Sequence, residues 1–210
     1  MTRLLAGASG WSYPSWRPGF YPGGTRPEEF LALYSARLPA VELNASGYRL
    51  PSAEQFARWA EQVPDGFAFA VKAPRLALRS PDTVRERVLA LGDRLGCVRV
   101  VLEGARDDAL LERLVTGFSG VPLALDPRDE SWQGALGGTD AVIVGNRDEH
   151  AGWCYLRFRD PPYDGAALAG IADEIRPLLD RGNRVFGFFR HEDEPSAPLA
   201  ALRLLDLIER

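Results

Sequence analysis

The chain has 210 residues, 46% of them hydrophobic and 26% charged, which is enough for a full core, and we expect one domain over residues 1–210 because no linker divides it. The net charge of −4 supplies no general attraction to phosphate backbones and argues against sequence-independent duplex binding unless a basic face is strongly segregated. No run approaches the roughly 18 apolar residues of a membrane span, so we expect no membrane partner and a cytoplasmic location.

Short apolar runs alternate along the chain with longer segments of helical periodicity. The runs predicted as strands are 4–9, 40–44, 67–73, 98–103, 121–126, 141–145, 153–159 and 184–189. The predicted helices lie within 27–38, 52–62, 81–95, 106–118, 165–181 and 196–209. Eight alternations of strand and helix favour an α/β fold of the (β/α)8 TIM-barrel type.

The predicted barrel is compact and irregular around its fifth to seventh strands. About fourteen residues separate Asp126 from Ala141, and the segment from Asn146 to Gly152 is too short for an ordinary helix. An incomplete barrel or an open doubly wound sheet remains the alternative.

Polar side chains recur where the predicted strands end. These are Asn44, Lys72, Glu103, Asp126, Arg157 and Arg159. Because the carboxyl ends of parallel strands meet on one face, we expect one pocket there. Strand alternation then turns Glu42 inward together with Asn44, and a buried carboxylate needs a partner, for which Lys72 and Arg157 are the candidates.

Three of these residues are the predicted catalytic groups. Glu42 or Asp126 would act as acid or base, and Lys72 as an electrophilic stabiliser or, if desolvated, as a nucleophile. The alternative is a charge network that only fixes the interior of the barrel.

The predicted substrate-binding groups are aromatic, amide and arginine side chains. They are Trp11, Trp16, Tyr21, Asn44, Tyr48, Arg49, Arg128, Trp132, Arg157 and Arg159. Aromatic loop residues can stack a sugar or base, and arginines can hold an anionic group. Alternatively, the aromatic loop that follows the first predicted strand closes the mouth of the barrel with a small core of its own.

The sequence gives little support to a metal or cofactor site, and we expect neither. Two histidines, His150 and His191, and two cysteines, Cys97 and Cys154, lack the spacing of metal ligands. The cysteines fall at or near the starts of apolar runs, as buried thiols in a reducing compartment do. Nucleotide-binding glycine motifs and the serine-esterase motif are absent from the sequence.

Four motifs in a fixed order resemble the YecE-like family, also called domain of unknown function 72. They run from Gly7 to Trp16 with Phe20-Tyr21-Pro22, from Val41 to Ser52, from Phe67 to Pro74, and from Leu125 to Trp132. The resemblance covers most of the chain. It implies a TIM-type fold and a shared pocket, but no settled activity.

The chain departs from that family pattern at three places. The usual E-x-R-H-x-S-W segment begins here with Asp126 and has lost its histidine, Gly47 replaces an aromatic residue, and the histidine expected after the K-A-P motif is missing. Any chemistry must then use the carboxylates or Lys72.

Two functions are predicted from these features. The first is an enzyme acting on a small polyhydroxy or phosphorylated substrate at the strand ends. The second is a binding protein for a nucleotide or single-stranded nucleic acid, without turnover. A structural or regulatory protein with a vestigial pocket is the third reading, and the oligomeric state is left open.

Overall fold

The computed structural model describes residues 4–44, 50–134, 136, 138–147 and 151–209. Within them the chain forms an α/β fold whose paired strands are all parallel. The strands are β1 (Leu4–Ala8), β2 (Ala40–Leu43), β3 (Ala68–Lys72), β4 (Leu95–Leu102), β5 (Leu123–Pro127), β6 (Val142–Ile143), β7 (Trp153–Phe158) and β8 (Arg184–Phe189). All eight predicted strands are therefore confirmed.

Six α-helices follow the predicted segments. They are α1 (Phe30–Ser35), α2 (Ala53–Glu61), α3 (Pro81–Val88), α4 (Asp108–Gly117), α5 (Gly165–Asp180) and α6 (Ser196–Glu209). Short 3-10 helices add Pro14–Trp16, Pro27–Glu29, Arg75–Leu78, Leu89–Arg94 and Glu130–Trp132. Ser52 caps α2 by accepting a hydrogen bond from the backbone N–H of Gln55, as serine commonly does at a helix start. None of the helices described is long and apolar enough to cross a membrane.

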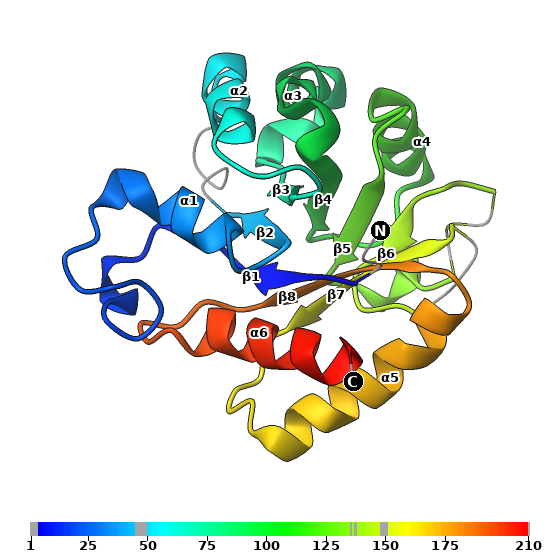
Figure 1. Ribbon diagram of the computed structural model, residues 1–210. Coiled ribbons are helices and arrows are strands. Elements are labelled where there is room, and N and C mark those ends of the chain that lie inside the picture. The colour runs from blue at the N-terminus through cyan, green and yellow to red at the C-terminus, as the bar shows by residue number, and fades with distance from the viewer. Residues whose placement is uncertain (1–3, 45–49, 135, 137, 148–150, 210) are drawn as a thin grey trace.

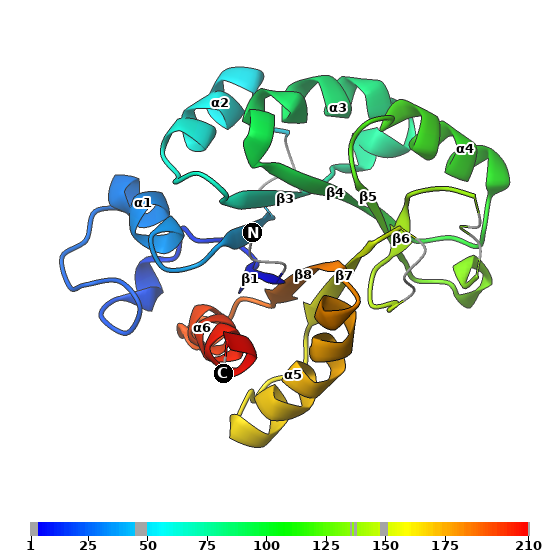
Figure 2. The same ribbon diagram turned by 45° about the vertical axis from the view of Figure 1, so that its right-hand side comes forward.

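The helices lie on the outer sides of the strands. Figure 1 shows α2, α3 and α4 on one side and α5 and α6 on the other, with the strands between them. Figure 2 shows α1 to α4 following one another around the outside. The helices thus cover the outer faces of the two sheets.

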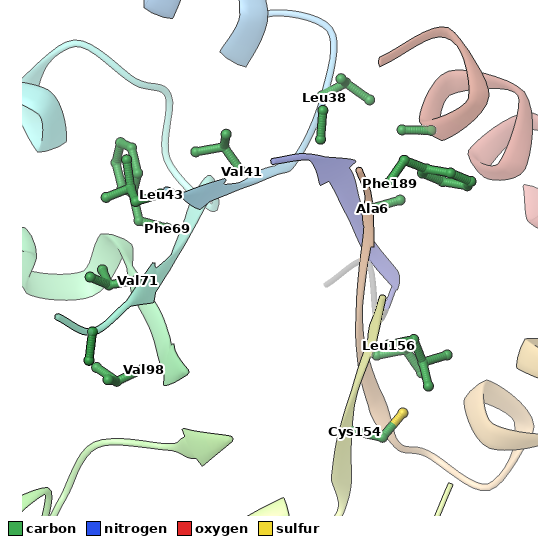
Figure 3. Close-up of a cluster of buried hydrophobic side chains, with 14 of the residues drawn as sticks. Ala6, Leu38, Val41, Leu43, Phe69, Val71, Val98, Cys154, Leu156 and Phe189 are labelled. Atoms are coloured by element: carbon green, nitrogen blue, oxygen red, sulfur yellow. The ribbon is translucent and has the colours of Figure 1, made fainter. Parts of the chain in front are cut away.

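Alternation along the strands separates an outer core from an inner one. Phe67, Phe69 and Val71 belong to the cluster beneath the helices, whereas Ala68 and Ala70 belong to the inner cluster. The outer layer is drawn in Figure 3, where Phe69 and Leu156 lie in different sheets. The inner cluster takes its members from all eight strands: Leu5, Ala40, Ala68, Ala70, Cys97, Ala124, Val142, Trp153, Tyr155, Phe186 and Phe188.

The closed barrel sheet is not confirmed. In the part of the chain that the structure describes, β2-β3-β4-β5-β6 form one sheet and β1-β8-β7 another. Among the described residues, one backbone hydrogen bond joins the edges at β6 and β7, from Gly145 N–H to the Tyr155 carbonyl at 2.8 Å. The irregularity expected around strands 5 to 7 is present, because β6 has only two residues.

At the other pair of sheet edges, a tyrosine hydroxyl lies between β1 and β2. The Tyr34 hydroxyl accepts from Ala8 N–H at 2.7 Å and donates to the Ala40 carbonyl at 3.0 Å, so it replaces direct pairing of β1 with β2. Gly7 makes this approach feasible, since a Cβ there would lie 1.9 Å from the Ala40 carbonyl oxygen. One isolated bridge, Ser9 with Glu42, pairs the segments just beyond this point.

Candidate functional site

Glu42 on β2 is fully buried, and each of its carboxylate oxygens has two partners. Oε1 accepts from Ser9 Oγ at 2.9 Å and lies 3.0 Å from a guanidinium nitrogen of Arg157. Oε2 accepts from the Tyr155 hydroxyl at 2.5 Å and from Arg99 at 3.3 Å. The predicted pairing with Arg157 is confirmed.

The pairing of Glu42 with Lys72 was predicted wrongly. In the residues that the structure describes, no ion pair joins them, because Glu42 lies opposite Ala70 in the parallel register and Lys72 lies opposite Arg99. The carboxylate of Glu42 pairs instead with Arg99 on β4, one strand beyond Lys72, and Arg99 was not among the predicted site residues.

Asp126 on β5 forms a second, shallower charge cluster. Its Oδ2 accepts from Arg99 Nε at 2.9 Å and from a terminal nitrogen of the same guanidinium. Arg159 contacts both oxygens, at 3.2 and 3.1 Å, and Arg128 lies 3.4 Å from Oδ1. Asp126 is thus surrounded by three cations, one on β4 and two in the segments that follow β5 and β7.

Arg99 connects the two carboxylates. It is 1% exposed on β4 and binds Glu42 through one terminal nitrogen and Asp126 through Nε and the other. A signal for it existed in the sequence: a single charge inside the apolar run V-R-V-V-L is costly to bury without partners. Ser9 and Tyr155 carried no comparable signal.

These contacts keep both carboxylates ionised. Burial by itself would raise the pKa of Glu42, but Arg99, Arg157 and the hydrogen bonds from Tyr155 and Ser9 lower that pKa below its usual value. Burial would also raise the pKa of Asp126, but Arg99, Arg159 and Arg128 outweigh this effect, so the pKa of Asp126 is lowered too. Burial and the neighbouring Glu42 raise the pKa of Tyr155 well above its usual range, so Tyr155 stays a neutral donor.

A cavity of about 600 Å³ opens above this network, within the range of small-molecule sites. Its lining residues come from six strands and the segments that follow them: Asn44, Lys72, Arg75, Arg99, Arg128, Arg157, Arg190 and His191. Among these lining residues six are cationic and none is acidic. The cavity is therefore a positively charged site in a protein of net negative charge.

Lys72 lies on the wall of this cavity as the last residue of β3. Its side chain is half-buried, and within the described ranges it has neither a hydrogen-bond nor an ion-pair partner. Burial, followed by the charge of Arg99, lowers the pKa of Lys72, although Glu42 acts in the opposite direction. Lys72 is thus partly desolvated, which is one of the conditions for a nucleophilic lysine.

A second cavity, of about 780 Å³, is mainly apolar. It is lined by Gly10, Trp11, Ser12, Tyr13, Pro27, Glu28, Leu31, Leu43, Asn44, Trp59 and Gln62. Trp11 and Trp59 meet edge to face there, with 5.2 Å between ring centroids. Asn44 lines both cavities, so the apolar and the cationic spaces are neighbours.

Three aromatic residues predicted to bind substrate lie in the core. Trp16 and Trp132 are 0% exposed and Tyr21 1%, and each donates to a backbone carbonyl: Glu192, Gly104 and Trp11 respectively. The first loop therefore forms a small core of its own, although Trp11 and Tyr13 of that loop line the apolar cavity. Tyr48 and Arg49, also predicted to bind substrate, lie outside the described residues.

Comparison with known proteins agrees with the four motifs. The family model described as "Protein of unknown function DUF72" matches residues 5–210. This chain belongs to the DUF72 family. Its four DUF72 motifs meet at one place, since they contribute Ser9, Glu42, Asn44, Lys72 and Asp126 to the network and the cavity above it.

Solved DUF72 structures share the fold over the whole chain. A family member from Thermotoga maritima MSB8 superposes with a TM-score of 0.80 at 21% identity, covering 99% of each chain. Another, from Enterococcus faecalis V583, gives 0.76 at 16% identity, covering 99% of this chain and 96% of the other. At these identities the likeness shows the fold alone.

One curated relative also matches. UPF0759 protein YunF of Bacillus subtilis (strain 168) is 36% identical over 70 residues, which are 33% of this chain and 24% of the relative. The chain thus matches about a quarter of the length of that protein.

Proposed function

We propose that the protein is an enzyme acting on a small phosphorylated substrate held in the cationic cavity. The observation that carries this proposal is the charge of the lining: one lysine and five arginines without an acidic residue among them. Among the described residues, three carboxylates contact these arginines, Glu42, Asp126 and Glu192, so the six lining cations keep an excess of three positive charges. A phosphate group would neutralise much of that excess.

The contacts favour a phosphorylated over a purely polyhydroxy substrate. Sugar hydroxyls are commonly bound by carboxylates, but both oxygens of Glu42 already accept from protein donors. By contrast, the Nε–H of Arg157 is buried and has no acceptor in the part of the chain described. An oxygen of an anionic ligand would suit the free donors of this guanidinium group.

In this proposal the two carboxylates position the arginines of the site. Glu42 orients Arg99 and Arg157, and Asp126 orients Arg99, Arg128 and Arg159. A buried carboxylate with a lowered pKa is a poor general acid near neutral pH, so Lys72 is left as the group that meets the substrate.

The proposal includes two finer features. The strands would enclose the inner cluster as an irregular TIM-type barrel, since all eight contribute to that cluster. The protein would work in the cytoplasm, because its two cysteines are free and buried.

Calorimetric titration with inorganic pyrophosphate tests the anion site. Arg128→Gln removes a cavity cation that is 43% exposed, and we expect about tenfold weaker binding from the loss of one charge-assisted contact. Arg203→Gln on α6 is the matched control, because this exposed arginine lines none of the cavities described. Absence of pyrophosphate binding, or equal affinity in both variants, would contradict the proposal.

A nucleotide is the second candidate ligand, and the shared residue Asn44 favours it. The phosphate would occupy the cationic cavity and the base the apolar cavity beside Trp11 and Trp59. Adenosine monophosphate should then bind more tightly than ribose 5-phosphate, and Trp11→Ala should reduce that difference. Equal affinity for the two ligands would contradict the binding of a base in the apolar cavity.

A further inference from the structure

The chain contains a single lysine among its 25 basic residues, and that lysine lines the cationic cavity. Everywhere else the chain uses arginine. Arginine holds anions at least as well as lysine, but its guanidinium stays protonated in proteins, whereas a lysine amine can lose its proton and react. A preference for arginine that stops at Lys72 indicates a requirement for a primary amine.

The position of Lys72 suits an amine that reacts with a bound ligand. It ends β3 directly opposite Arg99 in the strand register, so a guanidinium lies on the adjacent strand. Within the described residues its ammonium makes no hydrogen bond or ion pair that would have to break first. It lines both the cationic cavity and a smaller adjoining one of about 230 Å³.

The charged groups around Lys72 favour its neutral form. Burial is the largest influence lowering its pKa, and Arg99, Arg157 and Arg128 add to it, against the single carboxylate of Glu42. The other titratable or charged side chains on the cationic cavity are Arg75, Arg190 and His191, and the smaller adjoining cavity adds Glu103. Cationic neighbours and desolvation are the conditions that make lysine a nucleophile at neutral pH.

We infer that Lys72 forms a Schiff base with the carbonyl carbon of a phosphorylated aldehyde or ketone held by the surrounding arginines. This inference rests on the proposed function and names the reactive group of its substrate. The neutral amine attacks the carbonyl carbon, a C–N bond forms, and the C=O π electrons move to oxygen, which takes up a proton as nitrogen loses one. The nitrogen lone pair of this carbinolamine then expels the hydroxyl group, which takes up the proton that nitrogen loses and leaves as water, so that a C=N bond remains.

The anion site is what would make this reaction selective. A phosphate held by Arg128 and Arg157 fixes the carbonyl near the amine and excludes carbonyl compounds that carry no such group. Arg99, directly beside Lys72, disfavours reprotonation of the free amine.

Reductive trapping tests the inference. Pyridoxal 5′-phosphate and pyridoxal carry the same aldehyde and differ in the phosphate group, and sodium borohydride reduces either imine to a stable secondary amine. With one lysine, the α-amino group is the only competing primary amine, so peptide mass mapping separates the two sites. We expect trapping at Lys72 about tenfold faster with pyridoxal 5′-phosphate than with pyridoxal, and protection by excess inorganic phosphate.

Variants sharpen the result. Lys72→Arg keeps the charge and should show no adduct on residue 72, whereas Arg203→Gln should be trapped like the wild type. The double change Arg75→Gln with Arg190→Gln removes two exposed cavity cations and should lower the advantage of the phosphorylated aldehyde.

The outcomes separate this inference from the proposed function. Pyrophosphate binding together with trapping only at the α-amino group, or with equal rates for the two aldehydes, overturns the Schiff base and leaves the anion site in place. If the wild type neither binds pyrophosphate nor is trapped in a phosphate-dependent way, the proposed function is overturned as well.

Discussion

Lys72 and Arg99 occupy paired positions on the adjacent parallel strands β3 and β4, and both line the cationic cavity. Their surroundings differ in depth. Arg99 is buried and bound to two carboxylates, whereas Lys72 is half-buried with no partner among the described residues. One residue of the pair holds the site together, and the other is available to a ligand.

Replacing Lys72 by methionine should change the free energy of unfolding by less than about 1 kcal/mol, since the ammonium is partly desolvated and unpaired. Urea unfolding of Lys72→Met beside wild type measures this. A loss of several kcal/mol would instead place Lys72 in the structural charge network.

Replacing Arg99 by methionine should destabilise the protein by about 3–5 kcal/mol. The change leaves Glu42 with Arg157 as its one cationic partner, and it leaves Asp126 with Arg128 and Arg159, which are more exposed than Arg99. A buried carboxylate without full compensation is costly. Urea unfolding of Arg99→Met against Arg203→Met, which removes an exposed arginine outside the network, gives the comparison. Similar stability of the two variants would mean that the carboxylates have other compensation.

The stability of the protein should depend on pH through Glu42 and Asp126. Their pKa values are lowered in the folded state, so their contribution is complete above the unfolded-state values of about 4.3 and 3.9 and is lost as the pH falls towards the folded-state values. Glu42→Gln should therefore be less stable than wild type at neutral pH, by about 3 kcal/mol.

The difference between wild type and Glu42→Gln should then shrink below about pH 4, because protonated Glu42 resembles glutamine in charge. Thermal unfolding from neutral to acid pH measures both curves. A difference independent of pH would show that the hydrogen bonds of Glu42, and not its charge, stabilise the fold.

Both cysteines should resist thiol reagents in the native protein. Burial raises the pKa of Cys97 and raises the pKa of Cys154 to about 12, so neither forms a thiolate near about pH 8. Reaction with an aromatic disulfide reagent should be slow in buffer and complete in denaturant. Rapid native reaction of one thiol would show that its strand opens to solvent.

The sequence by itself determined the local elements. Apolar runs of strand length between segments of helical periodicity placed all eight strands, and the alternation of Phe67, Phe69 and Val71 with two alanines separated the outer and inner faces of β3. These features depend on the spacing of neighbouring residues, which the sequence displays directly. The cavity-lining positions of Asn44, Lys72, Arg128 and Arg157 follow from the same rule for strand ends.

Only the tertiary structure decided which side chains meet. The register between strands gave Glu42 to Arg99 and not to Lys72, and the packing of the first loop buried Trp16 while Trp11 lines a cavity. The same holds for the sheet edges, where Tyr34 lies between β1 and β2. Partners far apart in the chain are chosen by the geometry of the whole fold, which the periodicity of a single segment does not contain.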